Sequence, residues 1–162
     1  MSILIRGATE QDVPLIRQLI TELAEYEKLS DQVEATESLL HEHLFGPRPI
    51  VEAMIAELDG DAVGFALFFH NFSTFLGRPG IYLEDLFVRP HARGKGVGRA
   101  LLREIAKLAL RRKCGRLEWA VLDWNEPAIG FYKSLGAVPM DQWTIFRVTG
   151  DALDRLAREE QG

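Results

Sequence analysis

Three glycines alternate with other residues in Arg93-Gly94-Lys95-Gly96-Val97-Gly98, between a predicted strand and a predicted amphipathic helix. Glycine lets a backbone approach a ligand closely, and the first N–H groups of a helix have no acceptor within it. With the helix dipole behind them, such groups bind anions. The P-loop pattern does not fit this spacing, and the dinucleotide pattern requires glycine where Arg99 stands. The segment therefore predicts a pyrophosphate cradle of another kind.

Tyr132, Glu84 and Asp85 have side chains that could transfer protons. A phenol with a pKa of about 10 can act as a general acid. A carboxylate can act as a general base, directly or through water. Because Glu84 and Asp85 are adjacent on a predicted strand, we expect their side chains to point to opposite faces. An interfacial tyrosine and a salt-bridged strand carboxylate are the structural alternatives.

Other chemistry-bearing residues give weaker signals. Cys114 is the only cysteine, which excludes an internal disulfide and a multi-cysteine zinc site. Cationic residues precede it, but no histidine motif adjoins it, so we expect a structural thiol. His41 and His43 lie two positions apart on a predicted helix and therefore point in different directions. We predict no metal site.

Composition and charge restrict the remaining possibilities. The 162 residues, 47% hydrophobic and 27% charged, predict a single globular domain over residues 1–162. The N-terminus has no signal pattern and no apolar run suits a membrane helix, so we expect a cytoplasmic protein without a membrane partner. Residues 89–116 hold ten of the 19 Lys and Arg but one of the 24 acids, which favours an anionic ligand or a solvated helix face. The acidic remainder argues against nucleic acid as a partner.

Hydrophobic periodicity predicts a mixed sheet covered by helices, an α/β fold. A turn at 59–61 makes a hairpin of the second and third strands, and residues 71–80 are predicted to form a loop. Thr9 and Thr36 are the predicted N-caps of the first two helices. The predicted strands cover residues 3–6, 50–58, 62–70, 81–88, 117–122 and 143–148. The predicted helices run from Thr9 to about 27, from Thr36 to 44, onward from 94–98, over 126–135 and over 151–159.

The pattern Arg-x-x-Gly-x-Gly, after a strand ending Leu86-Phe87-Val88, resembles the coenzyme A loop of the GNAT superfamily of N-acetyltransferases. The segments Trp124-Asn125-Glu126-Pro127-Ala128 and Phe131-Tyr132-Lys133-Ser134-Leu135-Gly136-Ala137 look like that family's second cofactor segment. Tyr26-Glu27 and Ile81-Tyr82-Leu83-Glu84-Asp85 extend the resemblance to the diamine (spermidine/spermine) acetyltransferase group. The match covers nearly the whole chain, from about Ile3 to Val148.

The resemblance implies the GNAT acyl-CoA acyltransferase fold, in which a mixed, twisted sheet splays after its fourth strand and carries helices on both faces. It implies acetyl-coenzyme A as cosubstrate, with the pyrophosphate on the glycine loop and the pantetheine along the end of the fourth strand. The residues assigned to the cofactor in this way are Leu86, Phe87, Val88, Arg93, Gly94, Lys95, Gly96, Val97, Gly98, Arg99, Asn125, Glu126, Pro127, Ala128 and Tyr132.

The resemblance also assigns roles in catalysis and amine binding. Glu84 is the expected base, acting through water, and Tyr132 is the expected acid. Tyr26, Glu27, Glu84 and Asp85 are the expected binding residues for a small-molecule amine, which would attack the thioester directly in a ternary complex. A homodimer is expected, because the resembled group is dimeric. Acetylation of a protein or peptide amine, and a non-catalytic coenzyme A sensor, are the alternative functions.

The loop before the Tyr-x-Glu-Asp strand bears on which amine is accepted. In the resembled polyamine branch this loop carries an acidic residue followed two positions later by tryptophan, whereas this chain has Ser73 and Phe75. Each distant nitrogen of a polyamine favours a carboxylate of its own. This loop and the run Ala120–Asn125 look more like the thialysine Nε-acetyltransferase branch. We therefore expect a preference for a short, lysine-like amino acid.

Overall fold

The computed structural model describes residues 1–159. The chain divides into two compact units, Met1–Leu122 and Asp123–Gly162. That both belong to one acetyltransferase domain over 1–162 stays a prediction. Within residues 1–159, no helix has the length and the apolar character needed to cross a membrane.

The first unit contains a five-stranded mixed sheet in the order β1-β2-β3-β4-β5. The first four strands pair antiparallel, whereas β5 pairs parallel with β4 over Ile81–Leu83. Within the described residues, the second half of β4 therefore has no strand neighbour on the β5 side, and the sheet splays there. This confirms the predicted α/β fold with a splayed sheet. The strands are β1 (Ile3–Gly7), β2 (Glu52–Leu58), β3 (Asp61–Ser73), β4 (Arg78–Val88) and β5 (Leu117–Trp119).

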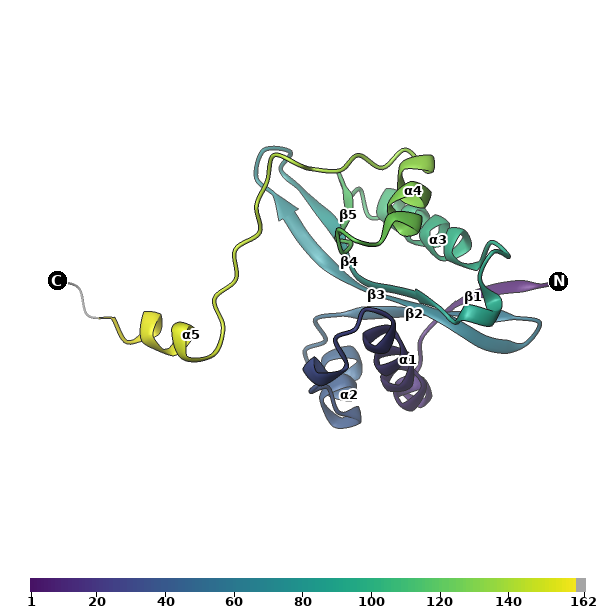
Figure 1. The fold of residues 1–162 in the computed structure, drawn as a ribbon, viewed down its shortest axis with the longest axis horizontal. Helices are drawn as coiled ribbons and strands as arrows, with labels where there is room; N and C mark the ends of the chain where they lie inside the picture. Colours follow the sequence, from purple (N-terminus) through teal and green to yellow (C-terminus); the bar gives the residue numbers. More distant parts are fainter. Residues whose placement is uncertain (160–162) are drawn as a thin grey trace. The chain divides into compact units, whose positions relative to one another are not determined.

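Helices cover both faces of this sheet (Figure 1). On one face lie α1 (Val13–Tyr26) and α2 (Glu37–Phe45), and on the other lies α3 (Val97–Arg111). The face below α1 is apolar because Phe65, Leu67 and Phe87 from the sheet pack with buried leucines and isoleucines of α1. The second unit contains α4 (Glu126–Ser134) and α5 (Gly150–Ala157).

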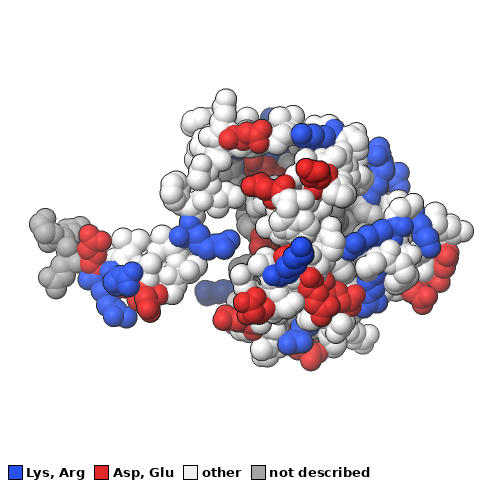
Figure 2. Space-filling model, in the orientation of Figure 1, with Lys and Arg blue, Asp and Glu red and all other residues white. Residues whose placement is uncertain are grey.

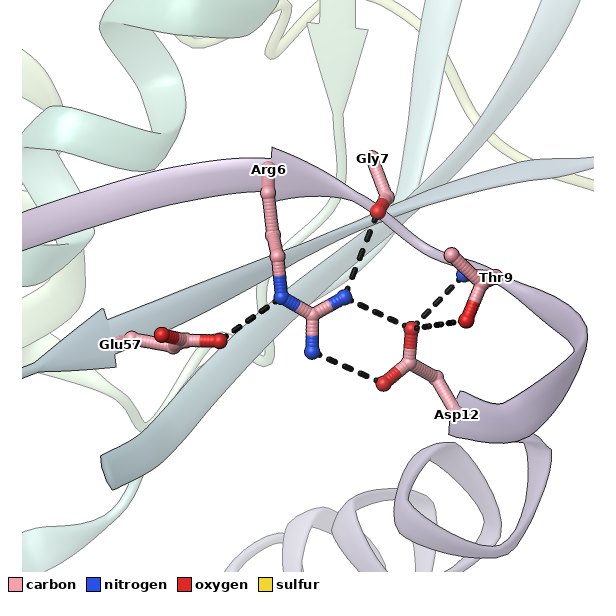
Figure 3. A network of polar contacts seen from close by, with 5 residues as sticks. All are labelled: Arg6, Gly7, Thr9, Asp12 and Glu57. Carbon is pink, nitrogen blue, oxygen red and sulfur yellow. Dashed lines mark hydrogen bonds and ion pairs between the residues drawn. The ribbon is translucent and has the colours of Figure 1, made fainter. Parts of the chain in front are cut away.

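A polar network fixes the start of α1 to the first strand (Figure 3). Asp12, in a short 3-10 turn before α1, accepts hydrogen bonds from Arg6 Nη1 at 2.7 Å, Arg6 Nη2 at 2.9 Å and the Thr9 N–H at 2.7 Å. Arg6 Nε also donates to Glu57 Oε2 at 2.7 Å. The Arg6 hydrogen bonds lower the pKa of Asp12 to about 2. This network therefore stabilises the fold at neutral pH, and the contribution is lost as the pH falls from about 4 to about 2.

Three predicted segments differ from the structure. Residues 71–80 are not a loop, because β3 and β4 extend into a tight turn in which the Gly77 N–H donates to the Ser73 carbonyl at 2.8 Å. The strand predicted over 117–122 ends at Trp119. The prediction of a strand over 143–148 is wrong, because in the described chain this segment pairs with no strand. Residues that favour strands form one only when a neighbouring strand accepts and donates their backbone hydrogen bonds.

The end of α3 is joined to the sheet by a chain of polar contacts. Arg112 donates to both carboxylate oxygens of Glu52, at 2.6 and 2.8 Å, and its Nη1 lies 2.8 Å from His70 Nε2. His70 Nδ1 lies 3.0 Å from the Gly80 carbonyl, so Nδ1 carries the proton and Nε2 accepts from Arg112. The Cys114 sulfur is 4.0 Å from Nδ1. Because this nitrogen is already protonated, it cannot activate the thiol, and the contact favours the expected structural role.

Candidate active site

The glycine loop has the geometry of an anion cradle. Gly96 is the N-cap of α3 with φ at 88°, and Gly94 has φ at 75°, conformations that favour glycine. The Ala100 N–H donates to the Gly96 carbonyl, so the N–H groups at 97–99 have no acceptor within the helix. A Cβ at Gly94 would meet no atom of residues 1–159 within 4 Å, and one at Gly96 would meet Ile3 Cδ1 at 4.0 Å. This open approach fits a pyrophosphate.

The Arg93 side chain turns back from the loop toward the end of the fourth strand. Its Nε donates to the Val88 carbonyl at 2.8 Å. Its guanidinium lies over the ring of Tyr26, 4.6 Å from the centroid, and 5.5 Å from the centroid of Phe87. The Arg93 side chain, which the family resemblance assigns to the cofactor, is thus engaged with residues of the chain itself. The feature of this loop that suits an anion is therefore the set of N–H groups at 97–99 rather than the Arg93 side chain.

A β-bulge interrupts β4 where the candidate base lies. Leu83 is opposite Phe68 and Asp85 is opposite Leu67, so Glu84 is the additional residue on β4. Leu67 belongs to the core beneath α1, whereas the adjacent Phe68 faces the other side of the sheet. Asp85, opposite Leu67, consequently faces α1. Leu83, opposite Phe68, faces the other side of the sheet, so the next residue, Glu84, also faces α1. The expectation that these two carboxylates point to opposite faces is wrong, because the bulge removes the two-residue period.

Three carboxylates gather where this bulge meets the end of α1. Glu27 is the C-cap of α1, directly after Tyr26. Burial raises the pKa of Asp85 to about 7, with further contributions from the charges of Glu84 and Glu27. Burial also raises the pKa of Glu27. The structure thus brings together the acids assigned to the amine, and their combined charge suits a cationic ligand.

The remaining predicted site residues lie in the second unit. Asn125 is 7% exposed, and its side-chain oxygen accepts a hydrogen bond from the Ala128 N–H at 3.4 Å as the N-cap of α4. Glu126 and Pro127 form the first turn of this helix. Tyr132 is half-buried on the same helix, with its ring centroid 5.7 Å from that of Phe131. Their contact with a cofactor stays a prediction.

The charges of the basic segment 89–116 are not isolated from the acids of the chain, and the face shown in Figure 2 carries both basic and acidic side chains. Part of its charge is paired with acids elsewhere in the chain or on the same helix. Arg89 pairs with Glu22, Arg112 with Glu52, and Lys107 with Glu104. The excess of Lys and Arg in the sequence is therefore partly neutralised by the fold.

Two features of the site were missed in the sequence. The bulge at Glu84 follows from the register with β3, and the only local signal is a pair of adjacent carboxylates in an otherwise apolar strand. The contacts of Arg89 with Glu22 and of Arg93 with Tyr26 join residues 67 positions apart in both cases. Such pairs have no local signal.

Comparison with known proteins gives consistent matches over the length of the chain. Residues 15–137 match the model of the acetyltransferase (GNAT) family. A thialysine N-epsilon-acetyltransferase of Bos taurus is 42% identical over 96% of this chain and 97% of its own. An L-ornithine N5-acetyltransferase of Arabidopsis thaliana is 35% identical over 94% and 86%. A solved integron cassette protein from the mobile metagenome of V. cholerae is 30% identical, with a TM-score of 0.82 over 98% and 99% of the two chains.

Proposed function

Since this chain belongs to the acetyltransferase (GNAT) family, we propose that it transfers acetyl from acetyl-coenzyme A to the side-chain amine of a small, lysine-like amino acid such as thialysine. Family membership implies the cosubstrate. The observation that carries the choice of a cationic amine is the gathering of Glu27, Glu84 and Asp85 at the β4 bulge. The relatives named for thialysine and ornithine support an amino-acid side chain as acceptor.

The cosubstrate would be held by two backbone features of the first unit. The N–H groups at 97–99 and the positive-φ glycines before them suit the pyrophosphate. The edge of β4 at Leu86–Val88, which β5 does not cover in the described residues, suits strand-like pairing with the pantetheine. We also propose Asn125–Ala128 and Tyr132 as cofactor-binding residues, because of their resemblance to the family's second cofactor segment. The cosubstrate supplies the acyl thioester that the amine attacks.

Proton transfers would be carried out by the chain's own side chains. Glu27 and Asp85 hold the ammonium group, and Glu84 accepts its proton through a water molecule. The amine nitrogen then forms a bond to the thioester carbon while an N–H near Val88 stabilises the oxyanion. As the carbon–sulfur bond breaks, Tyr132 gives its proton to the departing thiolate. The products are the N-acetylated amine and coenzyme A.

The acceptor can be tested directly by incubating amines with labelled acetyl-coenzyme A and analysing the products by mass spectrometry. We expect kcat/KM for thialysine to exceed that for spermidine by about tenfold or more, since each unmatched distant nitrogen loses a charge-assisted contact. A lysine-containing peptide serves as the control for a protein substrate. A tenfold preference for spermidine or for the peptide would contradict the proposed substrate.

We also propose that the chain forms a homodimer. The apolar side chains of the segment 143–148 support this: Trp143, Ile145 and Phe146 are 75%, 79% and 91% exposed. A concentration of large exposed apolar side chains is typical of an interaction surface. Light scattering at micromolar concentration should give twice the chain mass, and a monomer mass would contradict the proposal.

A homodimer would also decide whether Ser73, the last residue of β3, can influence the choice of amine. Ser73 pairs with Arg78, seven residues before Asp85 on β4, which places it about 23 Å away at about 3.3 Å per residue. Ser73 therefore cannot contact the nitrogen that is held at Asp85 of its own chain. A Ser73→Asp variant would move selectivity toward polyamines only through a distant nitrogen of a long polyamine, or through a second subunit that brings this turn to the pocket.

A further inference from the structure

Arg89, which is the residue directly after β4, is joined to α1 by a two-pronged ion pair. Its Nε and Nη2 donate to the two carboxylate oxygens of Glu22, both at 3.0 Å. Its Nη1 donates to the Ala62 carbonyl at 3.1 Å. The two side chains are 26% and 24% exposed, and the hydrogen bond from Arg89 lowers the pKa of Glu22. This pair is called the Glu22–Arg89 clamp below.

A second contact lies one helical turn further along. Glu22 and Tyr26 are four residues apart on α1 and so lie on one side of it. Arg89 and Arg93 flank the 3-10 turn Pro90–Ala92, and the Arg93 guanidinium lies over Tyr26. The last two turns of α1 are thus held at two points to the segment that leaves β4.

The clamp acts against a repulsion within the candidate amine site. Its carboxylates come from two elements, Glu27 from α1 and Glu84 and Asp85 from β4. The negative charges of Glu27 and Glu84 disfavour ionisation of Asp85, so ionised forms repel each other across the space between the elements. This repulsion opposes a close approach of the end of α1 to β4.

We propose that Arg89, acting through Glu22, is a positioning residue that holds the end of α1 against β4, so that Glu27 and Asp85 can contact the same ammonium group. The inference rests on the proposed function. The cofactor loop does not need this side chain, because its backbone is fixed by other bonds. These are the Arg89 N–H to the Val63 carbonyl at 2.7 Å, the Arg93 N–H to the Pro90 carbonyl at 3.2 Å, and Arg93 Nε to Val88.

The test is the kinetics of Arg89→Met with thialysine and acetyl-coenzyme A. We expect the KM for thialysine to rise about tenfold, with kcat and the KM for acetyl-coenzyme A changing by less than about threefold. Saturating amine should restore the rate, since the bound cation itself draws the carboxylates together. Glu22→Gln, which keeps the side-chain volume, should likewise raise the KM for thialysine and leave the KM for acetyl-coenzyme A nearly unchanged. Arg89→Lys should recover part of the thialysine affinity.

Arg112→Met is a matched control. It removes an Arg–Glu pair of the same two-pronged chemistry, between Arg112 and Glu52, at the end of α3 remote from the glycine loop. We expect both KM values to stay at the wild-type level in this variant. The double variant of Glu22→Gln and Arg89→Met should resemble either single variant, because both remove one interaction.

Two results would overturn the inference. One is a folded Arg89→Met or Glu22→Gln protein with wild-type KM for thialysine, and the other is an equal rise in both KM values. If Arg89→Met does not fold, Glu22→Gln decides the question alone. An absence of thialysine acetylation by the wild-type protein would instead refute the proposed function, and coenzyme A binding by calorimetry would show whether the cofactor site survives that result.

Discussion

Replacing Tyr132 with Phe is expected to lower kcat by about 10²–10⁴-fold, the usual contribution of a positioned general acid. Without the phenol, the departing thiolate must take its proton from water. The ring itself stays, and so does its contact with Phe131 on α4. The Kd of coenzyme A, measured by calorimetry, should therefore change little.

Tyr82→Phe is the control for this experiment. Tyr82 lies on β4 with its ring centroid 5.3 Å from that of Phe69, a contact that phenylalanine preserves. We expect its kcat to stay within about threefold of wild type. A Tyr132→Phe protein that keeps more than half of the wild-type kcat would remove Tyr132 from the mechanism.

The parts of the fold that sequence alone predicts are those specified by neighbouring residues. Thr36 caps α2 through a hydrogen bond from the Leu39 N–H, as its position before an apolar run indicates. The turn at Asp59 and Gly60, both with positive φ, joins β2 to β3 as predicted. The glycine loop opens α3 at Val97. Each of these features depends on fewer than about ten consecutive residues.

The parts that sequence does not predict depend on pairing between distant segments. The β4 bulge is a mismatch in register with β3, and it changes which face Asp85 occupies without changing any local preference. Residues 143–148 have the composition of a strand, yet a strand also requires a partner with unpaired backbone. The candidate site is therefore predictable as a set of residue types. The raised pKa of Asp85 depends on the bulge, which turns Glu84 and Asp85 to one face, and on Glu27 at the end of α1, and neither can be read from the local sequence.

Glu84→Gln is expected to lower kcat/KM for thialysine by about 10²–10⁴-fold at pH 7.5 if Glu84 is the base. The loss should be smaller at pH 10, where more of the amine is already neutral. The same change removes a negative charge beside Asp85, so the pKa of Asp85 should fall below its value of about 7. The rise of kcat/KM that accompanies ionisation of Asp85 should consequently move to lower pH.

Asp85→Asn is the matched comparison, because it removes the neighbouring carboxylate on the same bulge. The charged groups that act on it are Glu84 on β4 and Glu27 on α1. Loss of one charge-assisted contact should lower kcat/KM by about 10- to 100-fold at pH 8 and abolish the rise near pH 7.

Stability gives a second measurement that separates the two carboxylates. The pKa of Asp85 is raised above its unfolded value, so the folded protein binds the proton more tightly. Its contribution to the free energy of unfolding therefore falls as the pH rises from about 4 to about 7. Asp85→Asn should raise Tm at pH 8 and leave it nearly unchanged at pH 4.

The pH dependence of kcat/KM also tests which carboxylate is the base. The role of base would pass to Asp85 if Glu84→Gln lost kcat/KM equally across pH 7–10 while Asp85→Asn showed a larger loss that alkaline pH reversed.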